Sequence, residues 1–280
     1  MQSQDILRLY EEGYRDFSGL SLAGADFSGQ ILVGVNFAGA DLTGANLSRA
    51  FLTKANFTGA NLSWANLMFA KLSDSCLMAA TLTKANLRGA FGVRANLTQA
   101  SVSGAQLAHI NLRSATLVQA NFSGANLTGS NLRAARLTAA SCSWANLSGV
   151  RLVGGAIAAT RFTGVNFDQA FLNGLNFDGM DLSGVSFKAA RLKGASFREA
   201  DLTAANFSEA SLQNSDLQDA QLAGANLDYA QLHRAKLARA DLRRVNMTHV
   251  DWSDADLTGA CLSESPPTDM HRSNQWITVN

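Results

Sequence analysis

The residues that most often carry chemistry, cysteine and histidine, are few in this 280-residue chain. Thiols can act as nucleophiles or metal ligands, and imidazoles can act as acid–base catalysts or metal ligands. The candidates are Cys76, Cys142, Cys261, His109, His233, His249 and His271. Catalysis or metal binding would require several of these side chains to converge. Whether they can converge depends on the elements that position them.

Composition limits the class of protein. The formal net charge is +1 and 16% of residues are charged, which does not favour a generally acidic or basic partner surface. Polar residues interrupt every apolar stretch, so no membrane-spanning segment is expected. An odd number of cysteines without a visible secretory signal indicates reduced thiols, and we expect a cytoplasmic protein.

A five-residue repeat runs through nearly the whole chain. With Leu42 as a centre and steps of five in both directions, the register continues from Phe17 to Leu262 as 50 consecutive units. Only Gly92 and Cys142 replace a sizeable hydrophobic residue at a centre. The residue two before each centre is nearly always small, and 20 of the 23 glycines lie two after a centre.

The physical consequence of this period is a coil. Residues two apart in an extended backbone face the same side, so the small residue and the centre both point inward. Strict alternation would turn the next centre outward, because five is an odd number. A bend after each centre restores the orientation, and glycine tolerates the φ values that tight turns need.

A 20-residue modulation predicts the number of sides. Asn or Asp precedes the centre in 10 of 12 units of the set that contains Leu47, but in only 3 of 12 units of the set that contains Leu52. Each set recurs every 20 residues, so four units make one coil. About 12 coils stacked at the strand spacing of about 4.8 Å would form a rod roughly 60 Å long.

The A-(N/D)-(L/F)-(S/T)-G unit resembles the pentapeptide-repeat proteins. The resemblance covers residues 15–264 and implies an all-β solenoid, a right-handed quadrilateral parallel β-helix. The opening, ILRLYEEGYRDFSGLSLAGADF, is also similar to the start of many cyanobacterial members. Members of this family differ widely in role, so the resemblance implies the fold rather than the function.

The repeat divides the chain into three expected parts. Residues 1–14 would form an N-terminal capping helix, residues 15–264 the β-helix and residues 265–280 a C-terminal tail. An open coil end exposes unpaired backbone and an apolar core, which invites end-to-end association. A cap on the first coil therefore predicts a monomer or a weak end-to-end dimer.

The two ends carry different signals. Residues 3–13 show the apolar spacing of a helix, with Ser3 as the expected N-cap and Gly13 as the stop. In the tail, Trp276, Ile277 and Val279 follow two prolines. These three residues would either cover the last coil or stay disordered.

The predicted stacking keeps the reactive side chains apart. Cys76 and Cys142 are 66 residues apart, which corresponds to about 16 Å along the axis. A disulfide needs Cα atoms within about 7 Å. Cys142 occupies a centre and is interpreted as a small hydrophobic residue. His109 and His249 share a side but lie seven coils apart. We therefore predict no catalytic constellation, no metal site and no cofactor, and the protein is not expected to be an enzyme.

The side of the coil that contains Leu52 is basic. Its nine basic residues are Lys54, Lys71, Arg94, Arg113, Arg133, Arg151, Arg191, Lys193 and Arg234, against Asp74, Asp251 and Asp254. Its outward column contains the trios Phe51–Lys71–Phe91 and Arg151–Phe171–Arg191. Residues 20 apart would stack, so each trio predicts an aromatic–cation ladder. Such a ladder could be self-satisfied surface stacking or a binding strip for an acidic or aromatic-seeking partner.

A second candidate surface is apolar. Trp64, Met68, Phe69 and Met78 point outward in a fold that elsewhere exposes small polar residues. They lie around adjacent sides of neighbouring coils, where a contiguous patch would indicate an interface. Trp144 occupies the Trp64 column four coils further on.

These features favour a non-catalytic binding or regulatory protein that presents a rigid surface to a partner protein. The family resemblance offers an alternative, the DNA mimics that bind and protect DNA gyrase, but mimicry requires a strongly negative surface. The chain has 23 basic and 22 acidic residues. A net charge near zero also disfavours nucleic-acid binding. A purely structural, self-associating rod is the remaining class.

Gly92 is expected to mark a local irregularity, because its coil lacks one core side chain. Either Phe91 turns inward through a bulge and fills the gap, or Phe91 stays outside and a cavity remains. In the second case Gly92→Leu would stabilise the protein.

Overall fold

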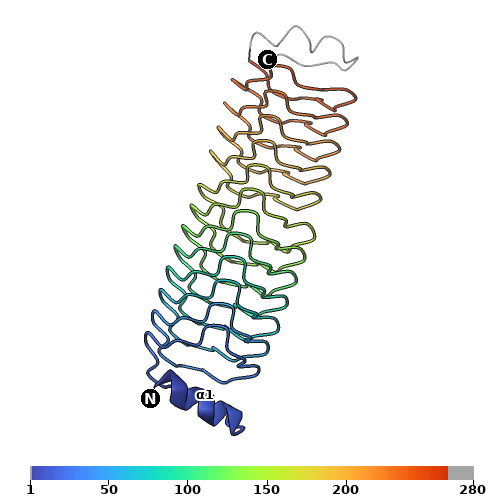
Figure 1. Cartoon of the computed structure of the whole chain (residues 1–280). Coiled ribbons are helices and arrows are strands. Elements are labelled where there is room, and N and C mark those ends of the chain that lie inside the picture. Colours follow the sequence, from blue (N-terminus) through green and yellow to red (C-terminus); the bar gives the residue numbers. More distant parts are fainter. Residues whose placement is uncertain (1, 264–280) are drawn as a thin grey trace.

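The chain winds into one continuous stack of coils with a short helix at one end (Figure 1). The computed structural model describes residues 2–263. Isolated parallel bridges join residues that are 20 apart, from Asp16–Asn36 to Asp241–Cys261. Four five-residue units therefore complete one coil, as the 20-residue modulation predicted.

Each unit consists of a short bridge and a tight turn. In the unit around Leu42, the Ala45 N–H donates to the Leu42 carbonyl at 2.9 Å, and Gly44 has φ of 64°. A positive φ at this third turn residue is typical of a type II turn. A similar φ recurs at every fifth residue from Gly19 to Gly259, in glycine and in other residue types alike. The coil thus imposes the turn even where glycine is absent.

The interior is filled by two columns of side chains. The centres from Phe17 to Leu262 are all buried. The residues two positions before each centre, which we call the inner column, are mostly small and mostly buried, as Ala45 and Ala125 illustrate. Between Phe162 and Phe207 the centres are rich in phenylalanine, and rings 20 apart stack, with centroids 4.8 Å apart for Phe187 and Phe207.

Backbone hydrogen bonds and asparagine side chains join successive coils. Leu127 N–H donates to the Asn146 carbonyl at 2.8 Å, and Asn146 N–H donates to the Ala125 carbonyl at 2.9 Å. The Asn126 Oδ1 accepts the Thr128 N–H at 3.1 Å and so closes its own turn. Asn246 Nδ2 donates to Asn226 Oδ1 at 3.0 Å, which joins two adjacent coils. These columns satisfy the turn backbone and each other, in line with the ordinary role of asparagine in turns.

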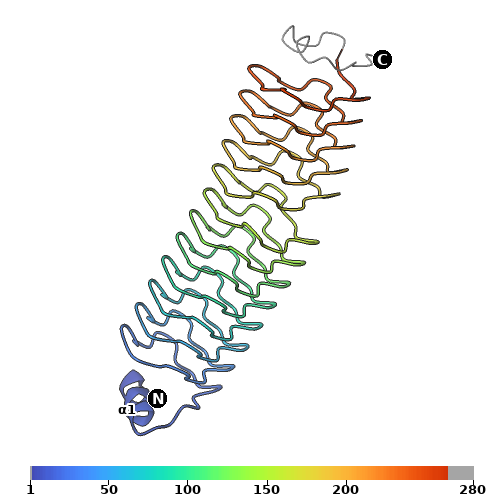
Figure 2. The ribbon, with the colours of Figure 1, turned by 90° about the vertical axis from the view of Figure 1, so that its right-hand side faces the viewer.

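Helix α1 (Ser3–Glu11) lies against the first coil (Figure 2). Ile6 is fully buried and the Tyr10 hydroxyl donates to the Val33 carbonyl at 2.9 Å. Two details of the predicted helix are wrong. Gln2, not Ser3, is the N-cap, because Asp5 accepts the Gln2 N–H at 3.0 Å. The helix also ends at Glu11, two residues before Gly13. The predicted tail, with Trp276, Ile277 and Val279, lies outside the described residues.

The Gly92 coil keeps the regular bonding pattern. Phe91 bridges Lys71 and Asn111 and is 41% exposed, so the inward bulge predicted as one alternative is wrong. Leu112 of the next coil places its Cδ2 2.9 Å from the position that a Cβ on Gly92 would occupy. The neighbouring coil therefore closes in over Gly92.

The hydrogen-bonded ladder opens at one level, which we call the seam. It lies between residues 154–164 of one coil and residues 173–183 of the next. Neither Ile157 nor Phe162 donates its N–H to the next coil, although the equivalent centres in the neighbouring coils do. Figure 2 shows visibly wider spacing on one edge of the stack at this level.

Candidate binding surfaces

The first trio on the basic side forms the predicted column. Phe51, Lys71 and Phe91 are joined by successive bridges, so their side chains project from one side of three stacked coils. The Lys71 Nζ lies 3.7 Å from the centroid of the Phe91 ring. Phe51 and Phe91 are 45% and 41% exposed. The stacking therefore leaves a large part of both rings open to a partner.

The second trio encloses an aromatic ring between two cations. The guanidinium carbons of Arg151 and Arg191 lie 5.3 Å and 4.5 Å from the centroid of the Phe171 ring. Bridges from Arg151 to Phe171 and from Phe171 to Arg191 fix the order. The positive charges approach the ring from opposite coils, which is the geometry of a favourable cation–π contact. Arg151 and Arg191 are both exposed.

Most of the positive charge on this side has no acidic neighbour. Arg94 pairs with Asp74 at 2.7 Å, and Arg234 pairs with Asp254 at 3.4 Å. The hydrogen bond from Arg94 lowers the pKa of Asp74 below its usual value. The other seven form no salt bridge within residues 2–263: Lys54, Lys71, Arg113, Arg133, Arg151, Arg191 and Lys193. Their charge is available to an acidic partner.

The apolar candidate surface is partly covered by its own chain. Trp64, Phe69 and Met78 are exposed and Met68 is half-buried. The Lys84 Nζ lies 4.6 Å from the Trp64 ring centroid. The Phe69 ring comes within 2.5 Å of the position that a Cβ on Gly89 would occupy, so it lies over that glycine. Trp144 covers Gly164 in the same way. Each of these two rings packs on the turn of the next coil, where a glycine has no side chain.

Sequence reasoning missed two stacked pairs that also lie 20 residues apart. Lys84 over Trp64 is one, and Tyr229 with His249, at a centroid distance of 4.3 Å, is the other. His249 also lies 3.5 Å from Asp228. The 20-residue spacing that identified the two trios could have found both pairs.

The potentially reactive side chains lie apart. Cys76, Cys142 and Cys261 are free thiols, and burial raises the pKa of Cys142 to about 12. Within the described stretch, no group of three His, Cys, Asp or Glu side chains could hold a metal ion. The His233 Nδ1 is 2.8 Å from the Ser253 hydroxyl. No helix among residues 2–263 is long and apolar enough to cross a bilayer.

Two family models match the repeat. The model described as "Pentapeptide repeats (8 copies)" matches residues 16–49, 36–74, 46–83, 75–113, 115–154 and 235–265, and that described as "Pentapeptide repeat region" matches residues 158–227. Together they span most of the chain, and such repeats form a right-handed β-helix. None of the curated proteins compared with the chain matches it.

Several solved structures are similar. The pentapeptide-repeat protein HetL, involved in heterocyst differentiation regulation in the cyanobacterium Nostoc sp. strain PCC 7120, is 28% identical, with 95% of this chain and 99% of that chain covered and a TM-score of 0.23. QnrB1, a plasmid-mediated fluoroquinolone resistance protein, is 16% identical, with 95% and 99% covered and a TM-score of 0.26. Rfr23 from the cyanobacterium Cyanothece 51142 is 25% identical, with 59% and 99% covered and a TM-score of 0.17.

Proposed function

Because this chain belongs to the pentapeptide-repeat family, we propose that it is a non-catalytic binding protein, a rigid rod of about twelve coils that docks a partner protein on its basic side. The observation that carries this proposal is the Arg151–Phe171–Arg191 trio, an exposed cation pair held on one aromatic ring. Neither arginine forms a salt bridge within residues 2–263.

The trio suits a carboxylate-bearing partner. A guanidinium that stacks on a ring by its face keeps its N–H groups free at its edge, where they can bind a carboxylate bidentately. The ring fixes the side chain in advance, which reduces the entropy lost on binding. The Lys71–Phe91 pair repeats this arrangement four coils away, so a partner could contact two preorganised points on one straight side.

The proposal includes a division of the chain into three parts. We propose that residues 1–14 close one end of the rod and that residues 15–264 form the repeat domain, while the predicted tail, residues 265–280, lies outside the described residues. With one end covered by α1, the rod would act as a monomer or a weak end-to-end dimer. We place its action in the cytoplasm because the three cysteines are free thiols.

The test compares two charge reversals of equal size. Arg151→Glu with Arg191→Glu should slow association with the partner captured from the native cell, while folding stays nearly intact because both side chains point outward. The matched control, Arg136→Glu with Arg161→Glu, changes the same charge on other sides of the rod and should leave association unchanged. A third variant, with Phe51, Phe91 and Phe171 changed to Ser, should release the partner.

Salt supplies the second criterion. Exposed charges are screened over about 8 Å at physiological ionic strength, so binding should weaken as salt rises. Equal effects of the two charge reversals would remove the basic side from the proposal. Potent gyrase inhibition that ignores Arg151 and Arg191 would replace the proposal with the DNA-mimic alternative.

A further inference from the structure

Charge is distributed unevenly along the rod. Residues 42–167, which we call the central section, contain 11 basic residues and a single acidic residue, Asp74. The parts on either side have the opposite balance, with six acidic and two basic residues in 2–41 and 13 acidic and nine basic residues in 168–263. The net charge near zero thus combines a strongly positive middle with two negative ends.

The positive charge of the central section is concentrated on the basic side. Six of the 11 basic residues lie there, and only Arg94 is neutralised, by Asp74 at 2.7 Å. The other five form no salt bridge within residues 2–263: Lys54, Lys71, Arg113, Arg133 and Arg151. Beyond the central section, Arg191 and Lys193 extend the same row of free cations.

The cations project from a continuous column of the basic side. Parallel bridges follow one another without a gap over residues 51–191 of this column. In its middle, the N–H groups of Arg113 and Arg133 donate to the Oδ1 atoms of Asn111 and Asn131, at 3.2 Å and 3.3 Å. These bonds fix the backbone from which the two exposed guanidinium groups extend.

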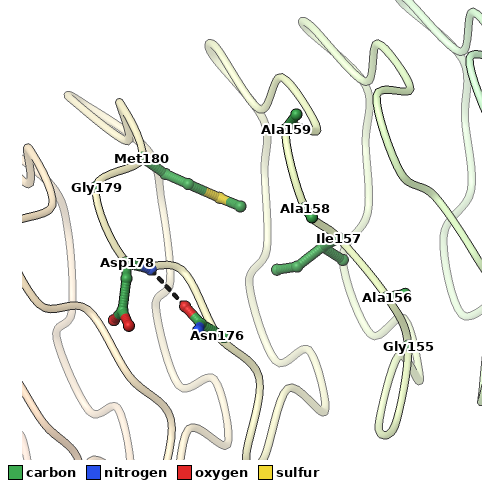
Figure 3. Close-up of a pocket in the computed structure, with 9 residues that line it drawn as sticks. All are labelled: Gly155, Ala156, Ile157, Ala158, Ala159, Asn176, Asp178, Gly179 and Met180. Atoms are coloured by element: carbon green, nitrogen blue, oxygen red, sulfur yellow. Dashed lines mark hydrogen bonds between the residues drawn. The ribbon is translucent and has the colours of Figure 1, made fainter.

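The seam does not interrupt this column, because it opens only two of the four sides. The Arg151–Phe171 bridge keeps the basic side closed, and the Phe167–Ser186 backbone bond, at 2.7 Å, keeps a second side closed. Figure 3 shows the opened level, where the Met180 side chain extends across a pocket toward Ile157. None of the residues that line this pocket belongs to the column. The basic side is therefore one uninterrupted surface.

The spacing of the free cations distinguishes between classes of anionic partner. The coils centred on Leu52 and Leu192 are 140 residues apart, or seven coils, so the seven cations are spread over about 34 Å, with one per about 5 Å. A nucleic-acid duplex carries one negative charge per about 1.7 Å, and most of its phosphates would have no cation beside them. An extended polypeptide with a carboxylate at every second residue presents one per about 6.6 Å on one face. The cations match the polypeptide.

An acidic segment also suits the remaining features of this surface. Side chains of like charge repel each other, so such a segment stays extended before it binds. The exposed rings of Phe51 and Phe91 can contact apolar side chains between its carboxylates. The same column continues to Asp251, and the negative ends of the rod would repel a longer segment. The charges therefore limit both the place and the length of the contact.

We propose that the basic side, from the coil of Leu52 to the coil of Leu192, binds an extended acidic segment of the partner protein that lies parallel to the rod axis. This inference rests on the proposed function, and it adds the chemical class of the bound segment and its direction on the rod.

The test is a fluorescence anisotropy titration of the full chain with a labelled twelve-residue peptide in which glutamate and threonine alternate. Arg113→Glu with Arg133→Glu should raise the Kd at least about tenfold, because each change replaces an attraction by a repulsion. Arg136→Glu with Arg161→Glu is the matched control, since it changes the same charge within the central section on other sides. At physiological ionic strength, where screening acts over about 8 Å, the control should change the Kd less than about threefold.

The length of the peptide tests its direction on the rod. A six-residue peptide of the same pattern spans about 20 Å, which is little more than half of the column, and it should bind at least about tenfold more weakly. Equal affinities of the two peptides would contradict binding along the axis. Unchanged thermal unfolding of the variants checks that the exposed substitutions leave the fold intact.

Two further outcomes would overturn the proposal. Equal losses in the two charge reversals would assign binding to the overall field rather than to the basic side. Tighter binding of a twelve-base-pair DNA duplex than of the peptide, in the same buffer, would replace the acidic segment by nucleic acid.

The proposed function and this inference fail in different ways. Loss of the captured partner on changing Arg151 and Arg191, together with peptide binding that ignores Arg113 and Arg133, would keep the docking side and reject the acidic segment. Peptide binding that depends on Arg113 and Arg133, with partner capture that ignores Arg151 and Arg191, would support the acidic-segment site and contradict the proposed function.

Discussion

The coils before the seam and the coils at the seam use the same five-residue unit, yet they respond differently to irregular residues. Before the seam, the centres include Gly92, Val102 and Cys142, and the ladder continues past all three. Ile110, a large residue in the inner column, is also accommodated, because Ala90 and Ser130 lie above and below it. A single irregular residue is absorbed by its neighbours.

At the seam, large inner residues occupy adjacent coils, so neither coil can yield. Thr160 is buried, and its hydroxyl donates to the Leu137 carbonyl at 2.8 Å, which ties it to the preceding coil. Met180 remains partly exposed at the opening. The comparison shows that the ladder continues past single irregular residues but opens at the level where Thr160 and Met180 occupy adjacent coils.

The largest expected effect comes from a charge in the regular region. Leu127→Asp should lower the free energy of unfolding by more than about 4 kcal/mol, because an unpaired carboxylate would enter a packed core. Leu127 is 1% exposed. Denaturant unfolding monitored by circular dichroism measures this, and a loss below about 1 kcal/mol would show that the regular coils yield as easily as the seam.

A second seam should form if the inner column of the regular region is overpacked. Ala100 and Ala120 face each other 20 residues apart and are both buried. Ala100→Thr and Ala120→Met should each cost about 1–3 kcal/mol, and the double variant should exceed the sum by about 0.5–3 kcal/mol because the two sites couple. Simple additivity in denaturant unfolding would contradict the role of inner-column pairs.

Alkaline pH should weaken the regular region through Cys142. Burial raises the pKa of this thiol from 9.0 to about 12 in the folded chain. The thiol ionises at a lower pH in the unfolded chain than in the folded chain. The neutral, buried thiol therefore contributes its full stabilisation of the fold below pH 9, and this contribution falls by about 1.4 kcal/mol per pH unit as the pH rises toward 12. Cys142→Ala should remove this slope. At pH 9, alkylation should modify the exposed Cys261 and spare Cys142, and equal labelling would contradict burial.

The smallest effect is expected at Gly92. Its φ is outside the positive range, so Gly92→Ala should raise stability by about 0.5–1 kcal/mol through a smaller entropy loss, with a small shift of the Leu112 methyl. Gly92→Leu should instead destabilise, because Leu112 already occupies the space. Thermal unfolding of both variants separates the outcomes, and stabilisation by Leu would restore the cavity interpretation.

The fold was predictable because its signal repeats. A period of five with a 20-residue modulation determines the four-sided coil, and the same spacing placed Lys71 beside Phe91 and Phe171 between two arginines. Helix α1 appears once, so its cap was misplaced by one residue. The orientation of Phe69 over Gly89 depends on a side-chain rotamer that no periodicity encodes. The seam could have been found by comparing inner residues 20 apart.

The seam also affects the mechanical stiffness of the rod. A rod that is bonded on four sides resists tension and bending almost equally along its length, whereas a level bonded on two sides is compliant. Bending about the two flanks that stay bonded, at Arg151–Phe171 and Phe167–Ser186, would change the angle between the two coils at the seam before any other bond stretches. Under a force applied at both ends, the molecule should therefore yield first at this joint, and the segments on either side should behave as two stiff levers.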